Sequence, residues 1–371
     1  MGSMIFYNYV AILGLFMLII NLRFANSNPP KFDAIYQIGD SLADTGNLIR
    51  VPIVGPTLPA ARPPYGITIG RPTGRWSDGL LIIDFIATYL GLPLLNPYLD
   101  RNASFVNGVN FANAGATALD FPFFLLKAIV IPPIVTPLPG QINWLRQYLS
   151  SISSSPTECL TRLMNSLVFM GEIGGDDINF PLQQGRSLQE IRTYIPSIIA
   201  AIVNGIKDVI GLGARRIVVP GNFPIGCLPF VLTLIANTNA TNPQQLDQFG
   251  CARSYNELAI YQNNYLQNAL NSLRVQYPNV TIVYADYYGA FISVLSRASI
   301  LGFDTANLFK ACCGSGGPYN YDGTLFNCGK PGSTVCPNPS SYISWDGLHL
   351  TQEAYRRISE VLISMILPQL L

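Results

Sequence analysis

The segment AIYQIGDSLADTGN, from Ala34 to Asn47, begins with an apolar run typical of a buried β-strand and ends in a turn rich in Gly and Asp. Ser41 follows the run, directly after Gly39 and Asp40. In an α/β protein, ligands bind at the carboxyl ends of the strands, where such a turn can expose a short side chain. The N-terminus of a following helix would stabilise negative charge that develops there. Ser41 is therefore a candidate nucleophile.

Short apolar runs like Ala34–Ile38 recur along the chain and alternate with amphipathic stretches. This alternation predicts an α/β fold, with a mostly parallel sheet covered by helices on both faces. No linker or shift in composition divides the chain, so we predict a single domain over residues 28–371. The other predicted strands are Leu167–Met170, Ile217–Val219 and Thr281–Tyr284, and the predicted helices are Leu80–Tyr89, Ile191–Ile210 and Asn256–Val275.

The composition excludes several classes of protein. Of 371 residues, 49% are hydrophobic and 12% are charged, which is about half the charged share usual for a soluble domain. Intrinsic disorder requires the reverse balance. A net charge of +1 leaves no surplus of Lys and Arg to neutralise phosphates, so no nucleic-acid partner is expected. The many Gly and Pro residues argue against a coiled coil.

The N-terminal residues 1–27 are predicted to form a secretory signal peptide. The apolar run Tyr9–Ile20 is too short to span a bilayer comfortably, and Ala25 and Ser27 provide the small residues of a cleavage site after Ser27. An uncleaved membrane anchor is the alternative. Cleavage would remove Arg23 and balance the basic and acidic residues, and we expect no stable membrane insertion afterwards.

Glycosylation sequons agree with secretion. An Asn-X-Ser/Thr sequence in a secreted protein marks a possible N-glycosylation site on the surface. Three such sequons are present, at Asn102, Asn239 and Asn279.

The cysteines indicate an oxidising compartment. Four of the seven lie from Cys312 to Cys336, in a Gly- and Pro-rich stretch that we expect to be cross-linked by disulfides. The odd number leaves at least one free thiol, which we expect to be Cys159. No metal site is expected, because the chain has one His and Cys312 is adjacent to Cys313 instead of spaced as C-x₂-C.

An unusually apolar segment, Phe121–Leu138, carries only one charge, at Lys127. Its four prolines forbid a regular membrane-spanning helix. We favour a buried, irregular insertion. The alternatives are an apolar wall or lid beside a substrate and, less favoured, a membrane contact.

A Ser nucleophile needs a base, which is usually a His oriented by a carboxylate. His349 is the only histidine, and Asp346 precedes it by three residues. That spacing allows the carboxylate to fold back onto the imidazole ring. A lone His is usually structural, but here it is the only possible histidine base for Ser41. The G-x-S-x-G motif of α/β-hydrolases is not present.

The Ser41 and His349 motifs are the first and last of four blocks: Gly39-Asp-Ser-Leu42, Gly108–Thr117, Gly171–Asn179 and Asp346-Gly-Leu-His349. A further segment, Pro63-Pro-Tyr-Gly66, lies between the first two. In this order they resemble the plant GDSL lipase/esterase family of the SGNH-hydrolase superfamily, over nearly all of the chain after residue 27. Within the family, the chain resembles the branch of the sinapine and acetylajmalan esterases, which act on esters of specialised metabolites.

The resemblance implies a flavodoxin-like, three-layer α/β/α fold and a set of roles. Ser41 would be the nucleophile, Asp346 and His349 would complete the triad, and the backbone N–H groups of Ser41 and Gly115 would donate hydrogen bonds to the oxyanion. No cofactor is implied, and the partners would be a small-molecule ester and either water or an alcohol. In a plant, the secretory route leads to the apoplast or the vacuole.

One position departs from the family pattern. The family places an Asn in the third block, where its amide donates to the oxyanion, whereas this chain has Asp176. An ionised carboxylate only accepts hydrogen bonds. Asp176 could be held protonated by burial, the protein could be a non-catalytic binder, or the site could be retuned to hold an acceptor hydroxyl.

We favour the retuned site. Hydrolysis and transfer share an acyl-Ser41 intermediate, and an alcohol held by Asp176 can compete with water through proximity. The favoured prediction is thus an acyltransferase that moves a group such as a hydroxycinnamoyl from one ester to a polyol, a sugar acid or a second ester. The alternatives are a carboxylesterase that hydrolyses such esters or acetylated alkaloids, and a non-catalytic binding protein.

Overall fold

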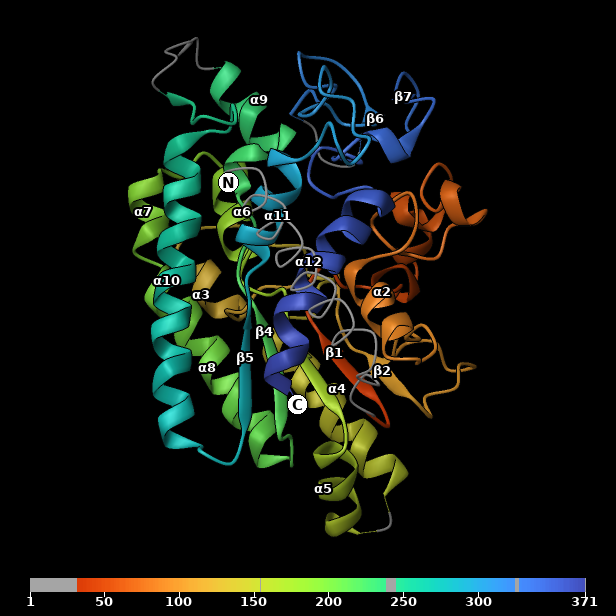
Figure 1. Cartoon of the computed structure of the whole chain (residues 1–371), viewed down its shortest axis with the longest axis vertical. Helices are drawn as coiled ribbons and strands as arrows, with labels where there is room; N and C mark the ends of the chain where they lie inside the picture. The colour runs from red at the N-terminus through yellow and green to blue at the C-terminus, as the bar shows by residue number, and fades with distance from the viewer. Residues whose placement is uncertain (1–31, 154, 238–244, 324–326, 371) are drawn as a thin grey trace, which may run out of the picture. The chain divides into compact units, whose positions relative to one another are not determined.

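The computed structural model describes residues 32–370, except residues 154, 238–244 and 324–326. Its centre is a five-stranded parallel sheet in the order β2-β1-β3-β4-β5 (Figure 1). This is the flavodoxin-like strand order, whose topological switch point lies between β1 and β3. The strands are β1 (Ile35–Ile38), β2 (Gly108–Asn110), β3 (Leu167–Met170), β4 (Arg216–Pro220) and β5 (Thr281–Ala285).

The predicted α/β fold with a parallel sheet is confirmed. The four predicted strands correspond to β1, β3, β4 and β5, because strands buried on both faces appear in the sequence as short, continuous apolar runs. Strand β2 was not predicted. It has three residues, of which only Val109 carries an apolar side chain, and its place is set by pairing with β1, where Ile35 lies opposite Gly108.

Helices cover both faces of the sheet, which gives the three layers. The three helices of one group contact β1, β3 and β5. In the other group, one helix contacts β5 and the other two pack against that helix. Figure 1 shows α8 and α10 on one side of the strands and α2 and α12 on the other. The first group is α4 (Leu138–Ile152), α8 (Ile195–Gly211) and α10 (Arg253–Gln276), and the second is α2 (Ile82–Tyr89), α11 (Tyr287–Ser296) and α12 (Gln352–Leu370).

One helical run of the described residues, Leu188–Gly211, is long and apolar enough by composition to cross a membrane. Half of its most apolar window is buried inside the protein. Its isoleucines, such as Ile198 and Ile202, are buried where α8 packs against β3, α4 and α10. The core position of this helix therefore accounts for its apolar composition.

Shorter elements complete the described chain. A two-stranded antiparallel hairpin lies within the cysteine-rich stretch. Short helices follow the carboxyl ends of β2, β3 and β4, and the helix Pro156–Met164 leads into the amino end of β3. These elements are α3 (Phe121–Leu126), α5 (Pro156–Met164), α6 (Asp176–Gln183), α7 (Leu188–Arg192), α9 (Pro229–Asn237), β6 (Cys313–Gly314) and β7 (Thr334–Val335).

Two predicted features fall outside the described residues: the signal peptide over residues 1–27 and the sequon at Asn239. The other two sequons are accessible. Asn102 and Asn279 both lie in exposed turns, as glycosylation requires.

The disulfides follow the predicted pattern. The four cysteines of the stretch from 312 to 336 pair as Cys312–Cys336 and Cys313–Cys328. A third disulfide joins Cys227 to Cys251, and Cys159 is free, as expected. Three disulfides in one chain indicate folding in an oxidising compartment, consistent with the secretory pathway.

Candidate active site

Ser41 lies in a tight turn directly after β1, at the switch point of the sheet. The turn is closed by hydrogen bonds from the N–H groups of Ala43 and Asp44 to the carbonyl of Asp40. The side chain of Gln141 holds the base of this turn, since it accepts from the N–H of Gly39 and donates to the Gly39 carbonyl, both at 2.8 Å. A buried clamp of this kind fixes the backbone that presents Ser41.

His349 and Asp346 form a buried pair across the site. His349 Nδ1 lies 2.7 Å from Asp346 Oδ2, and the other carboxylate oxygen accepts from the backbone N–H of His349 at 2.8 Å. Burial opposes ionisation of Asp346, but the charge and hydrogen bonds of His349, with the hydroxyl of Tyr65, hold its pKa below the usual range. Asp346 is therefore a carboxylate that fixes the ring and leaves Nε2 as the free basic nitrogen.

Ser41 and His349 line the same cavity. Within the described residues, His349 Nε2 is buried and has no hydrogen-bond partner. Hydrogen bonds between a nucleophile and its base are often long before substrate binds. The arrangement therefore brings together the three predicted triad residues, with the basic nitrogen available to the Ser41 hydroxyl.

Tyr65 is a further site residue that the triad prediction missed. Its hydroxyl donates to Asp346 Oδ2 at 2.7 Å, the same oxygen that contacts His349. The ring is 1% exposed and packs edge-on against Trp76 and Trp345. The segment Pro63–Gly66 was among the family-like motifs, but the contact joins residues 281 positions apart and only the fold makes it visible.

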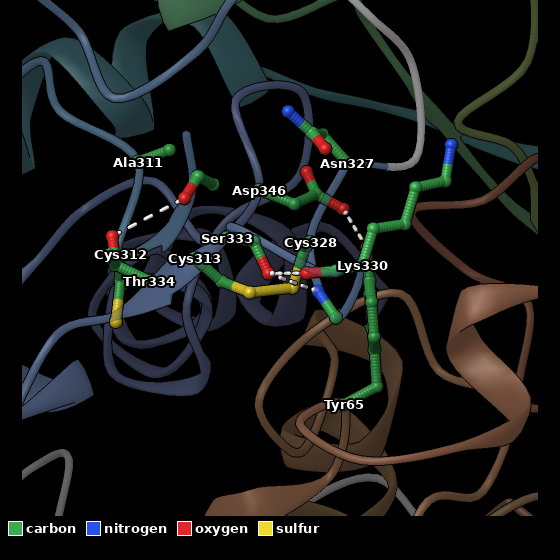
Figure 2. Close-up of a disulfide and its surroundings, with 12 residues drawn as sticks. Tyr65, Ala311, Cys312, Cys313, Asn327, Cys328, Lys330, Ser333, Thr334 and Asp346 are labelled. Carbon is green, nitrogen blue, oxygen red and sulfur yellow. Dashed lines mark hydrogen bonds between the residues drawn. A yellow bond between two sulfur atoms is a disulfide. The ribbon is translucent and has the colours of Figure 1, made fainter. Parts of the chain in front are cut away.

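The cysteine-rich stretch supports the segment that carries Asp346. The N–H groups of Cys312 and Cys313 donate to the carbonyls of Ser344 and Trp345, at 3.0 and 2.6 Å. Figure 2 shows the Cys313–Cys328 disulfide close to Asp346 and Tyr65. Both disulfides of this stretch belong to a small second core with Tyr65, Trp76 and Trp345. The disulfides thus support the segment that carries Asp346 and His349.

Two backbone N–H groups are placed as candidate oxyanion donors, those of Ser41 and Gly115. Neither donates to another group in the described part of the chain. Asp44 ties their loops together, because its Oδ2 accepts from the N–H groups of Leu48 and Ala114. Gly115 has φ +83°, and a Cβ there would lie 2.7 Å from Val135 Cγ1, so this position requires Gly.

Asp176 is the first residue of α6 and is 6% exposed. Burial raises its pKa to about 6, opposed by a hydrogen bond from Asn179 Nδ2 to its Oδ1 at 3.1 Å and by His349. The next residue, Asp177, accepts from the N–H groups of Ala118 and Leu119 and so fastens α6 to the Gly115 loop. Asp176 therefore changes protonation between mildly acidic and neutral pH.

Asp176 is one of several buried carboxyl groups beside Ser41. Burial, with the charges of Asp176 and Asp177, raises the pKa of Glu172 to about 8. Burial and the charge of Glu172 raise the pKa of Asp40 well above its usual value. Burial also raises the pKa of Asp177 to about 7. Glu172 is a second residue that the sequence prediction missed. No group of three or more His, Cys, Asp or Glu in the described residues is arranged to hold a metal ion.

The cavity over Ser41 has a volume of about 140 Å³ and is lined mainly by apolar side chains. Pro132, Ile134 and Val135 form part of its wall. The segment Phe121–Leu138 is therefore a wall beside the site, as one alternative predicted. The favoured prediction, that this segment is a buried insertion, is wrong in part, because Leu125 and Leu126 are 80% and 85% exposed. The four prolines leave only the short helix α3 in this segment.

Comparisons with known proteins agree with this geometry. Residues 35–362 match the family described as GDSL-like lipase/acylhydrolase. The chain is 52% identical over 341 residues to acetylajmalan esterase 2 of Rauvolfia serpentina, covering 91% of each chain. It is 49% identical to acetylajmalan esterase 1 of the same plant, covering 92% of this chain and 88% of the relative.

Two further matches are more distant. A GDSL esterase/lipase of Arabidopsis thaliana is 42% identical, with 90% of this chain and 82% of the relative covered. An extracellular lipase from Streptomyces rimosus of known crystal structure aligns with 89% of this chain and 99% of its own, at 12% identity and a TM-score of 0.37.

Proposed function

Because the chain belongs to the GDSL-like lipase/acylhydrolase family, whose members hydrolyse carboxylic esters, we propose that it hydrolyses small-molecule esters with Ser41 as the nucleophile. The observation that carries this assignment is the basic nitrogen of His349. It is buried and has no partner among the described residues, it is oriented by Asp346, and it lines the cavity that contains Ser41.

The residues present account for each step of ester cleavage. His349 Nε2 takes the proton of the Ser41 hydroxyl as Oγ attacks the ester carbonyl. The protonated imidazole is stabilised by Asp346 and returns the proton to the leaving alkoxide. Water then attacks the acyl-Ser41, again giving a proton to His349, and collapse of that intermediate releases the acid and restores Ser41.

Negative charge on the carbonyl oxygen is stabilised by the N–H groups of Ser41 and Gly115. Preorganised donors of this kind supply a large part of the rate enhancement in acyl transfer. Asp176 adds a third donor only when its carboxyl group is protonated. The proposed oxyanion site is therefore complete in mildly acidic conditions, such as those of the apoplast or the vacuole, where we place the mature protein.

The cavity and the relatives point to the substrate class. The cavity of about 140 Å³ offers apolar contacts from Leu48, Leu58 and Phe180. The named relatives are esterases of acetylajmalan, an acetylated compound. We propose that the substrate is a small acyl ester, such as an acetate, of an apolar ring-containing alcohol of the alkaloid type.

Acyl transfer to an alcohol is the second candidate. It rests on Asp176, whose carboxylate can accept a hydrogen bond from an acceptor hydroxyl within the same cavity. The names of the relatives favour hydrolysis, and the enzyme family of the chain disfavours a purely binding role. We therefore favour hydrolysis over acyl transfer, which Asp176 alone had favoured.

A direct test uses the secreted protein, p-nitrophenyl acetate and an acetylated alkaloid. A fluorophosphonate should label Ser41 stoichiometrically, and Ser41→Ala should lower kcat/KM by roughly 10⁴-fold or more with an unchanged melting temperature. Free acid and new ester are quantified separately, with and without an added polyol. Full activity of Ser41→Ala would refute the assignment of Ser41 as the nucleophile. New ester in excess of free acid would establish the transferase instead.

A further inference from the structure

A second, smaller cavity lies beside Ser41 and His349. Its volume is about 30 Å³, against about 140 Å³ for the apolar cavity. Both cavities share Ser41, Asp176, Leu348 and His349, and the rest of their linings differ. The small cavity is lined by the polar side chains of Asp40, Glu172, Asn179 and Asn222, with Gly175 between Glu172 and Asp176. Apolar side chains such as Phe223 and Leu228 form the rest of its wall.

Three of its lining residues carry buried polar atoms that have no hydrogen-bond partner within the described residues. They are Glu172 Oε1, Asn179 Oδ1 and His349 Nε2. Glu172 and His349 are each 3% exposed, and Asn179 is 8% exposed. An unpaired buried polar atom is destabilising, so three such atoms on residues that line one cavity call for a common partner.

A single water molecule fits both the size and the chemistry. A cavity holds a water when it has room for about one probe sphere, roughly 10–15 Å³, and offers two to four polar partners. The volume of about 30 Å³ and the three unpaired atoms meet both conditions.

We propose that this cavity holds the water that hydrolyses the acyl-enzyme, and that Glu172 and Asn179 position it against His349. This inference rests on the proposed function and deepens it. In deacylation the water oxygen forms a bond to the acyl carbon while its proton passes to His349 Nε2. The bond from the acyl carbon to Ser41 Oγ then breaks, His349 returns the proton to Oγ, and the carboxylic acid leaves.

Asp176 gains a role in this arrangement. Its Oδ1 accepts from Asn179 Nδ2, so the amide of Asn179 is oriented with its oxygen left as an acceptor. That oxygen has no hydrogen-bond partner within the described residues, and Asn179 lines the small cavity. The pKa of Glu172, raised to about 8 by burial, leaves this side chain neutral and able to donate to the water oxygen. The water can then donate to both Asn179 and His349.

Gly175 offers a way to fill the cavity. It has φ −72°, which any residue adopts, and a Cβ placed there would lie 2.8 Å from Glu172 Oε1. Gly175→Ala therefore puts a methyl group where the water meets Glu172. Gly211→Ala is the matched control, because this glycine ends α8 and a Cβ there would meet no atom within 4 Å.

The experiment follows p-nitrophenyl acetate turnover and measures acetylated Ser41 by mass spectrometry of the quenched protein. Gly175→Ala should lower kcat about tenfold to a hundredfold, as loss of positioning does, and the acetyl-enzyme should accumulate. Added methanol, entering from the open apolar cavity, should restore turnover more in this variant than in the wild type. Gly211→Ala should behave as the wild type.

A second pair of variants does not depend on Gly175. Glu172→Leu should repeat the slow deacylation, whereas Glu172→Gln should retain most of the rate, because the amide still hydrogen-bonds to a water. A wild-type kcat in both Gly175→Ala and Glu172→Leu would overturn the inference, as would a lower kcat without accumulation of acetyl-enzyme. The proposed function fails separately, by absence of turnover and of Ser41 labelling in the wild type.

Discussion

Replacing Asp176 with Asn tests whether a carboxyl group can serve as the third oxyanion donor. The two side chains have the same shape, but the amide donates at every pH, whereas the carboxyl group donates only when protonated. Burial raises the pKa of Asp176 to about 6. Activity that needs this donor should therefore fall as pH rises through about 6, and Asp176→Asn should remove that dependence.

The size of the effect follows from the fraction of protonated Asp176. With a pKa of about 6, that fraction is ~90% near pH 5, ~10% near pH 7 and ~1% near pH 8. One oxyanion donor typically contributes on the order of 10²–10³ in rate. The activity ratio of the wild type to Asp176→Asn should thus fall about fiftyfold to eightyfold between about pH 5 and pH 8, and the variant should exceed the wild type at the upper end.

The assay is kcat/KM for p-nitrophenyl acetate at each pH, which reports on the free enzyme. Taking the ratio of the two proteins cancels every effect of pH on activity that both share. It also leaves any effect of Asn179 orientation as a constant factor, so only the slope with pH is informative. A ratio that stays flat from about pH 5 to pH 8 would refute the donor role of Asp176.

Three other predictions test the surroundings of the site. Tyr65→Phe removes a hydrogen bond to the Asp346 carboxylate and should lower kcat/KM about tenfold while leaving KM nearly unchanged, as steady-state kinetics will show. Replacing Cys313 and Cys328 together with Ser should lower both activity and melting temperature, because this disulfide braces the Asp346 segment; unchanged values would make the bond irrelevant to the site. The raised pKa of Glu172, about 8, means that the folded state holds a proton which the unfolded chain releases near 4.5, so the contribution of Glu172 to stability is greatest in acid and is lost as pH rises towards 8. Glu172→Gln should make the melting temperature fall less steeply between about pH 5 and pH 8, with the share of Asp176 and Asp177 remaining, and an unaltered slope would count against the assignment.

Local sequence was sufficient for the fold wherever a signal extends over several residues. The strands β1, β3, β4 and β5 are mostly apolar runs, and α10 has the expected amphipathic spacing. Helix α8 begins at Ile195, four residues later than predicted, because α7 ends at Arg192 and a turn separates the two. Strand β2 has too few residues to show any period, so only its pairing with β1 defines it.

The site divides in the same way. Asp346 and His349 lie three residues apart, so their contact could be predicted from spacing, and Ser41 could be predicted from its place after a strand. The contact of Tyr65 with Asp346 depends on the fold, as does the placement of Glu172. Burial could not be read from the sequence either, and burial is what turns an acidic residue at position 176 into a group that titrates near neutrality.

Two properties of Asp176 belong to one arrangement. A carboxylate at an oxyanion site repels the charge it faces, which makes it unfavourable unless it is protonated or has another use. Here burial of Asp176, opposed by Asn179 and His349, raises its pKa and favours the protonated form. At the same time Asp176 accepts from Asn179 and leaves the amide oxygen free at the small cavity.

A single residue then serves acylation as a donor and deacylation as an orienting acceptor. An Asn at position 176 could keep the first role at any pH, but its amide could orient Asn179 in either sense. Asp in place of Asn at position 176 therefore makes activity dependent on acid conditions and fixes the orientation of Asn179 towards the water.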